Sequence, residues 1–413
     1  MRKGRGEKML LLSFVGTGEY KEVTYVLQDG SKECKTKFFV QAANEFYNPS
    51  KIIIFMTKAA EEKYHSELQS ILDYKLERIQ EGKTIQELWN NFDTISSAIP
   101  NDEEIIIDIT HAFRSIPIVT LSVLTFLKTL NDIKINKIIY GAYEAKEFYN
   151  GKAPVFDLTN FLYLIEWSYA TEEFLKFGNA KRLRKLLEDI HNTTYKTNAD
   201  TKSIALKSLG KTIDELTRAL SVVRPMEVLS HVKELQGKIE KAKVDINNLV
   251  EVRPLAKLLE KLPSNFRVMS EAKGDLFSNA GFQAQIEMLN FYIEIENYQQ
   301  AITLARELIV SLLCSQRKLN PLAKEDREKA ENMLNEWKSL SEKGLALLDS
   351  PKQYAQLWSK IVEYRNDINH AGMRKDPIAA QSLISNIIDL CKEISKFVVY
   401  NDDINNQSIT ASL

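Results

Sequence analysis

The spacing of hydrophobic positions changes near residue 157. Before it, short runs rich in β-branched and aromatic residues alternate with amphipathic stretches, and the central runs are continuously apolar, as in parallel strands covered on both faces. We expect strands at 9–16, 34–43, 51–57, 103–110 and 136–143, and helices at 61–80, 84–99 and 117–130. This alternation predicts a Rossmann-like, doubly wound α/β sheet, closed by a hairpin that turns at Asn150-Gly151.

The rest of the chain shows helical spacing and almost no strand signal. Predicted helices occupy 161–177, 180–192, 201–223, 226–244, 253–262, 284–316, 325–348, 353–372 and 377–400. No repeat period is evident, which argues against a solenoid. The pattern predicts an α/β domain at 1–165, an all-α connecting region at 166–280 and an all-α domain at 281–413.

Composition restricts the possible functions. Lys and Arg (55) nearly balance Asp and Glu (56), so a nucleic-acid site has to be local rather than a property of the whole molecule. Cys34, Cys314 and Cys391 lack the spacing of a zinc cluster or a disulfide framework, which favours a reducing cytoplasm. The apolar run after the N-terminal charges is short and lacks a cleavage pattern, and longer runs are interrupted by charge. We therefore expect a cytoplasmic protein with no membrane partner and no resident metal or cofactor.

Two strand ends in the α/β half carry candidate binding chemistry. Gly16-Thr17-Gly18 follows the first strand, where a doubly wound sheet places its ligand crevice and where glycines let backbone N–H groups approach an anion. Lys21 stands where a dinucleotide fingerprint has its third glycine, and the chain has no phosphate-binding loop of the G-x-x-x-x-G-K-[ST] type. Ordinary dinucleotide or ATP binding is therefore a poor interpretation.

The second strand end is the segment from Asp108 to Pro117, with Ser115 as a predicted N-cap. A His, an Arg, a Thr and a helix N-terminus suit a phosphodiester, and Phe113 or Tyr20 could stack on a base. In the structural alternative, Asp108 and Thr110 cap a turn and Phe113 lies in the core. The predicted ligand-binding residues are Gly16, Thr17, Gly18, Glu19, Tyr20, Thr57, Asp108, Thr110, His111, Phe113, Arg114 and Ser115.

Near the C-terminus, Arg365 and His370 form a candidate catalytic pair, with Asn366 beside the arginine. Metal-free RNA cleavage needs groups that exchange protons and a cation facing the phosphorus, which His and Arg can supply. Five positions on an ideal helix correspond to about 140°, so the two side chains do not share a face unless the helix ends there. Gly372 is a predicted helix stop. A symmetric dimer would bring two such pairs together. Taken alone, the pair is more typical of a solvated helix end.

The two N-terminal segments together resemble the CARF domain of type III CRISPR accessory proteins. The branch concerned has F-x-G-T-G-x-Y near its start, here Phe14 to Tyr20, and D-[IV]-T-H-G-x-R-x-x-P later, here Asp108 to Pro117. Ala112 replaces the expected glycine, which could change how closely the loop approaches a ligand. The segment R-N-D-I-N-H resembles the R-polar-x-x-x-H signature of HEPN ribonucleases, matching Arg365, Asn366 and His370.

The combined resemblance, to Csx/Csm-type CARF–HEPN effectors, implies a specific activity in antiviral defence. It implies a metal-independent endoribonuclease that leaves 2′,3′-cyclic phosphates. Its partners would be single-stranded RNA as substrate and a cyclic oligoadenylate as allosteric activator, with cyclic tetra-adenylate favoured. The activator would bind at a CARF dimer interface of a homodimer or a larger even-numbered homo-oligomer.

Three other classes remain as alternatives. A ligand-sensing regulator that binds DNA would need a basic recognition helix, and the candidate at 180–191 has the alternating charge of a solvated face, so we expect no stable DNA binding. A metal-dependent nuclease would need a carboxylate constellation such as D-x-D or E-x-K ending a strand, and we find none. The third class is an interaction protein without nuclease activity.

Overall fold

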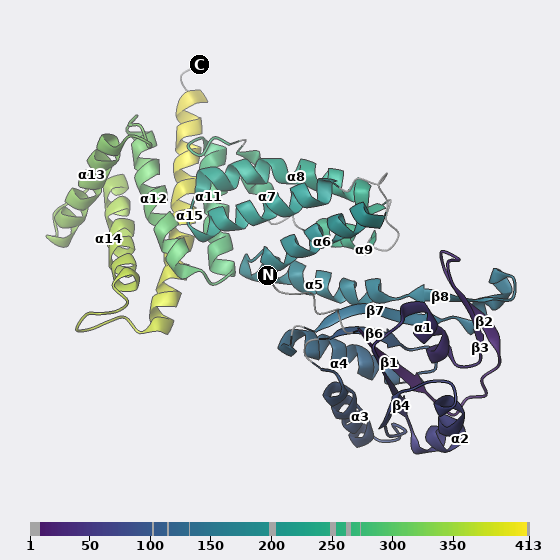
Figure 1. The fold of residues 1–413 in the computed structure, drawn as a ribbon. Helices are drawn as coiled ribbons and strands as arrows, with labels where there is room; N and C mark the ends of the chain where they lie inside the picture. Colours follow the sequence, from purple (N-terminus) through teal and green to yellow (C-terminus); the bar gives the residue numbers. More distant parts are fainter. Residues whose placement is uncertain are drawn as a thin grey trace, which may run out of the picture. The chain divides into compact units, whose positions relative to one another are not determined.

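In the computed structural model, the apolar runs of the N-terminal half form the centre of one eight-stranded sheet (Figure 1). The strand order is β3-β2-β8-β7-β6-β1-β4-β5. Neighbouring strands are parallel except for the pairs β2–β3 and β7–β8. The strands are β1 (Met9–Val15), β2 (Val23–Leu27), β3 (Glu33–Thr36), β4 (Lys51–Met56), β5 (Lys75–Arg78), β6 (Glu104–Asp108), β7 (Lys134–Gly141) and β8 (Ala153–Asp157).

Helices cover both faces of this sheet, because successive side chains of the central strands point to opposite sides. In β1, Leu11 and Val15 belong to the core shared with α1 (Phe39–Tyr47) and α2 (Lys58–Gln69). Leu10, Leu12 and Phe14 belong to the opposite core, shared with α3 (Ile85–Ala98) and α4 (Ile116–Asn131). The predicted N-terminal α/β sheet domain is confirmed.

Three local predictions in this half were wrong or incomplete. Residues 34–43 are not one strand, because β3 ends at Thr36 and α1 begins at Phe39. The helix predicted at 61–80 ends at Gln69, and β5 follows it at the sheet edge. The antiparallel pair β7–β8 exists, and Asn150 and Gly151 have positive φ. However, the 3₁₀-helix η1 (Tyr143–Tyr149) precedes that turn, so the connection is not a tight hairpin.

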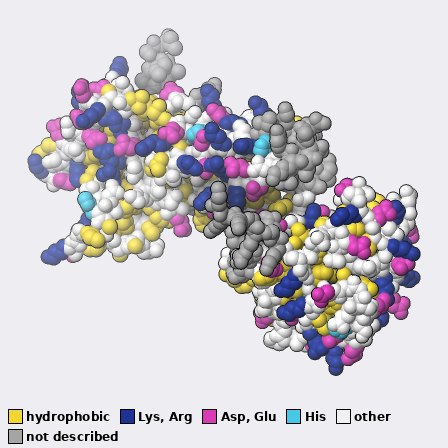
Figure 2. All heavy atoms as spheres, in the orientation of Figure 1, with side chains coloured by type: hydrophobic (Ala, Val, Ile, Leu, Met, Phe, Trp, Pro, Cys, Tyr) yellow, Lys and Arg dark blue, Asp and Glu magenta, His cyan; other side chains and the backbone are white. Residues whose placement is uncertain are grey.

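The structure describes residues 9–100, 103–113, 115–131, 133–197, 204–247, 253–261, 266–272 and 274–410. The chain divides into two compact units, Met1–Tyr163 and Leu164–Leu413, with the boundary inside α5 (Thr159–Phe177). On the face shown in Figure 2, acidic and basic side chains are interspersed over both units. That face therefore carries no large field of one sign, in keeping with the balanced composition.

The second unit is helical, as predicted. It continues with α6 (Lys181–Thr197), α7 (Ile204–Ser221), α8 (Pro225–Asn247), α9 (Arg253–Leu259), α10 (Arg267–Glu271), α11 (Asn279–Glu294), α12 (Tyr298–Gln316), α13 (Lys324–Glu342), α14 (Asp349–Asn369) and α15 (Ala380–Thr410). The single helix predicted at 284–316 is two, because Glu296 adopts φ 59° between α11 and α12. One hydrophobic core extends from Trp167 to Val398. The subdivision predicted at residues 280 and 281 stays a prediction.

Within the described ranges, no helix has both the length and the apolar character that crossing a membrane would require.

Candidate ligand pocket and candidate ribonuclease residues

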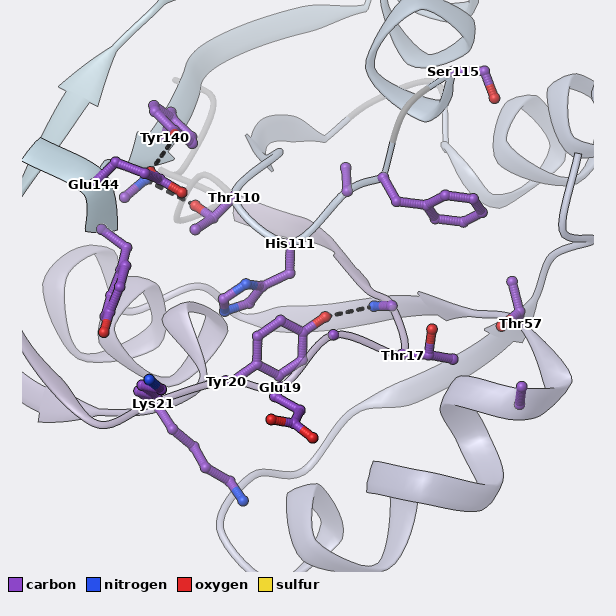
Figure 3. A pocket seen from close by; sticks show the side chains of 18 of the residues that line it. Thr17, Glu19, Tyr20, Lys21, Thr57, Thr110, His111, Ser115, Tyr140 and Glu144 are labelled. Atoms are coloured by element: carbon purple, nitrogen blue, oxygen red, sulfur yellow. Dashed lines mark hydrogen bonds between the residues drawn. The ribbon is translucent and has the colours of Figure 1, made fainter.

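An open pocket of about 900 Å³ lies at the carboxyl ends of β1, β4, β6 and β7 (Figure 3). This is the edge where doubly wound sheets bind ligands. Every predicted ligand-binding residue lines the pocket except Asp108 and Arg114. Asp108 lies in the buried end of β6, and Arg114 lies outside the described residues. The topology therefore brings together segments that are far apart in the sequence.

The loop after β1 folds back on itself beside the pocket. Gly16 N donates to Tyr20 Oη at 2.9 Å, and burial raises the pKa of Tyr20 to about 12, so the phenol stays protonated. The Tyr20 ring lies 4.0 Å from the imidazole of His111, measured between ring centroids (Figure 3). One side of the Tyr20 ring is therefore already covered by His111 within the pocket wall.

Helix α2 holds the same loop through two backbone carbonyls. Lys63 Nζ donates to the carbonyl of Thr17 at 2.9 Å, and the Tyr64 hydroxyl donates to that of Gly18. Thr57 caps the start of α2 by accepting from Ala60 N at 3.3 Å, and it lines the pocket. The N-terminus of α2, with its partial positive charge, therefore lies at the pocket edge. Our reading of the sequence missed Lys63 and Tyr64.

Asp108 lies behind the pocket lining and fixes the position of Thr110, which lines the pocket. It is fully buried, and its carboxylate accepts from Ser13 Oγ at 2.6 Å and from Thr110 N at 2.8 Å. Thr110 Oγ1 in turn accepts from Gly141 N at 2.8 Å, which ties β6 to β7. Removal from water raises the pKa of Asp108 to about 6. Asp108 is thus a turn-forming residue rather than part of the lining, as in the structural alternative.

His111 is a neutral wall residue. Its Nε2 accepts a hydrogen bond from Phe39 N at 3.2 Å, at the first position of α1. Burial lowers the pKa of His111 to about 4, so the ring carries no charge near neutral pH. At neutral pH His111 therefore contributes no cation to the pocket. Phe113 both lines the pocket and packs against the core beneath α4.

Sequence reasoning missed part of the lining, including its described cations. Lys37 pairs with Glu67 at 2.6 Å, and Lys83 pairs with Glu81. Lys21 lines the pocket and has no ion pair with any residue that the structure describes. The other lining residues that were not predicted are Tyr25, Ala59, Glu81, Gly82, Ala112, Tyr140, Gly141, Tyr143 and Glu144. Several of them follow β5 or end β7, so applying the strand-end rule to every strand would have found them.

Ser115 directly precedes α4, as the N-cap prediction required. Its carbonyl accepts from Val119 N at 3.0 Å, the first backbone bond of the helix. Because Ser115 also lines the pocket, the start of α4 faces the same space as the start of α2. Two helix N-termini and a glycine loop around one pocket favour an anionic ligand.

The second candidate site lies at the end of α14. Arg365 is partly buried, whereas Asn366 and His370 are exposed. Arg365 Nε is buried and has no hydrogen-bond partner in the part of the chain that the structure describes. The helix stays regular through Asn369, so Arg365 and His370 remain about 140° apart around its axis. One chain therefore presents the two side chains on different faces.

The chain leaves α14 through a Schellman motif around His370. Ala371 N donates to Ile368 O at 2.9 Å, and Gly372 N donates to Asp367 O at 2.8 Å. His370 is the C-cap residue, and Ala371, at φ 53°, occupies the left-handed position that usually holds glycine. The predicted stop at Gly372 is thus one residue late. Among the described residues, no group of three or more His, Cys, Asp or Glu could hold a metal ion.

Comparison with known proteins adds independent information. A family model described as the second domain of CRISPR-associated protein MJ1674 matches residues 163–271, which correspond to most of α5 through α10. The curated CRISPR-associated protein MJ1674 of Methanocaldococcus jannaschii is 25% identical over 327 residues. The match covers 78% of this chain but 46% of the relative, so the chain spans less than half of the relative's length. Both matches support a CRISPR-associated protein.

Proposed function

We propose that the protein is a CRISPR accessory endoribonuclease that a cyclic oligoadenylate activates. The observation that carries the proposal is the pocket, because it gathers the Gly16–Tyr20 loop, the segment after β6 and two helix N-termini at one sheet edge. These groups suit the phosphates of an anionic ligand. The similarity to CRISPR-associated protein MJ1674 favours the same context.

In this proposal, Arg365, Asn366 and His370 cleave the RNA without a metal. His370 exchanges protons with the reacting oxygens, and Arg365 offsets the charge that develops on the phosphate. The buried Nε of Arg365 has no hydrogen-bond partner among the described residues, which supports an anion-binding role for that side chain. Since one chain holds the two residues on different faces, a homodimer would complete the site by supplying both pairs around one phosphate.

The allosteric step requires that the activator bind the active arrangement more tightly than the resting one. Cyclic tetra-adenylate is the favoured ring, because its symmetry suits a pocket shared across a twofold axis. The proposed ligand contacts are backbone N–H groups of the Gly16–Tyr20 loop, the N-termini of α2 and α4, and Lys21, which has no ion pair among the described residues.

The test combines a fluorescent single-stranded RNA with each of the cyclic tri-, tetra- and hexa-adenylates, with EDTA present throughout. We expect one ring to switch on cleavage, and Arg365→Ala and His370→Ala each to abolish cleavage while activator binding stays unchanged. Full cleavage by either variant would remove the catalytic assignment. Ring binding without any RNA cleavage by the unaltered protein would instead favour a sensing or interaction protein.

A further inference from the structure

The loop that follows α14 is fixed to the helix by one buried carboxylate. The side chain of Asp367 is 3% exposed, forms an ion pair with Arg374 (3.1 Å from Nε) and accepts a hydrogen bond from Ile378 N at 3.3 Å. Its backbone carbonyl accepts from Gly372 N at 2.8 Å. A buried carboxylate is stable only when such donors satisfy it. Residues near the start, middle and end of this loop therefore converge on Asp367.

The contacts that fix the Arg374 guanidinium are made by its Nε atom. Nε donates to Asp376 O at 2.9 Å, while the side chain is 42% exposed. Its two terminal nitrogens make no hydrogen bond with the residues that the structure describes. Because the guanidinium group is planar, fixing Nε sets the direction of these terminal nitrogens. Arg374 thus presents an oriented pair of N–H donors to solvent.

This oriented cation lies close to His370. Asp367 and His370 are three residues apart at the end of α14, a spacing that makes side chains neighbours on a helix surface, with about 5–6 Å between Cβ atoms. The loop also turns back at once, since Met373 N donates to His370 O at 2.9 Å. The guanidinium that contacts Asp367 is therefore within about one helical turn of His370.

We propose that Arg374 binds a phosphate of the single-stranded RNA substrate beside the phosphate that is cleaved, and that Asp367 is the positioning residue that orients it. The inference rests on the proposed function. The free edge of an oriented guanidinium matches two phosphate oxygens, which gives both strength and direction. RNA runs past a cleavage site as a chain of phosphates, so a cation next to His370 would hold the strand in register.

The experiment measures binding of the full-length protein to a fluorescent 2′-O-methyl RNA, which cannot be cleaved, with cyclic tetra-adenylate present and over a series of salt concentrations. Arg374→Gln is compared with Lys375→Gln, which removes the same charge from an exposed neighbour. We expect Arg374→Gln to weaken binding about tenfold or more and to reduce the salt slope by about 0.7 for each lost phosphate contact. Lys375→Gln should change affinity less than about threefold.

Two further variants separate orientation from charge. Arg374→Lys keeps the charge but lacks the fork, so we expect binding closer to that of Arg374→Gln than to the unaltered protein. Asp367→Asn keeps an acceptor for Ile378 N but weakens the hold on Arg374, so KM for a cleavable RNA should rise with little change in kcat. Thermal unfolding of each variant checks that the helical unit stays folded.

Different outcomes reject different parts of the reasoning. Equal losses in Arg374→Gln and Lys375→Gln, with RNA bound and cleaved normally by the unaltered protein, would overturn the role of Arg374 alone. If Arg374→Lys binds RNA as tightly as the unaltered protein, the proposed roles of the planar guanidinium and of Asp367 in orienting it would be overturned. An unaltered protein that neither binds nor cleaves RNA with any ring would overturn both this inference and the proposed function.

Discussion

Replacing Gly141 with alanine should destabilise the N-terminal unit through overpacking at the pocket floor. A Cβ at Gly141 would lie 2.5 Å from Phe39 Cδ2 and 2.8 Å from Tyr25 Cε1, whereas carbon atoms normally pack at about 3.5–4.0 Å. Both aromatic rings are almost fully buried, so neither can swing into solvent. Overpacking of this kind typically costs about 1–3 kcal/mol, and the backbone of Gly141 has no positive φ to add strain.

The matched control is Gly16→Ala in the same pocket wall. Its nearest neighbours would be Tyr20 Oη at 3.5 Å and His111 O at 3.6 Å, which are ordinary contacts. We therefore expect its effect on stability to stay within about 0.5 kcal/mol. Hydrogen exchange of the slowest amides in β1 and β6 reports opening of the N-terminal unit alone. Exchange should accelerate about 5- to 150-fold in Gly141→Ala. Equal exchange in the two variants would refute the steric reasoning.

Two other substitutions test the buried carboxylate of Asp108 and the left-handed residue Ala371 at the end of α14. Raising the pKa of Asp108 to about 6 corresponds to ~3 kcal/mol of stability that is present below about pH 4 and lost as pH rises through 6. Asp108→Asn should remove this loss of stability, since an amide can still accept from Thr110 N and donate to Ser13 Oγ. The measurement is the free energy of unfolding in urea from pH 4.5 to 8. The same pH dependence in the variant and the unaltered protein would contradict this expectation. Ala371→Gly should stabilise the helical unit by about 0.5–1 kcal/mol, because glycine adopts φ 53° without strain. An unchanged or lower midpoint in thermal unfolding would show that Ala371 is not strained.

The hydrophobic pattern predicted the strands that are buried on both faces of the sheet. It missed the polar edge strand, which forms through backbone pairing with its neighbour. Ile52 to Met56 are buried on both faces, so their apolar run is a strong strand signal. The edge strand Lys75–Arg78 is polar and forms because β4 offers it backbone partners. Such long-range pairing overrides local propensity and does not appear in the hydrophobic period.

The same contrast explains which parts of the candidate sites were predictable. The Gly16–Tyr20 loop and Thr110 to Ser115 follow apolar strands directly, so the ends of those strands identified them. Lys63 and Tyr64 bond to a loop 46 residues earlier in the chain, and their sequence context reads as an ordinary amphipathic helix. The neutral state of His111 depends on its burial against α1, which composition does not reveal.

The attachment of the Gly16–Tyr20 loop to α2 affects the entropy of ligand binding. Because Lys63 and Tyr64 already hold the carbonyls of Thr17 and Gly18, the ordering of this loop takes place during folding. Ordering a flexible loop on ligand binding costs about 0.5–1.5 kcal/mol per immobilised side chain. A preorganised loop avoids this cost, so the affinity for the ligand is not reduced by it. The loop should therefore keep the same conformation in the free and the occupied protein, and we expect any change in the pocket wall on ligand binding to lie outside this loop.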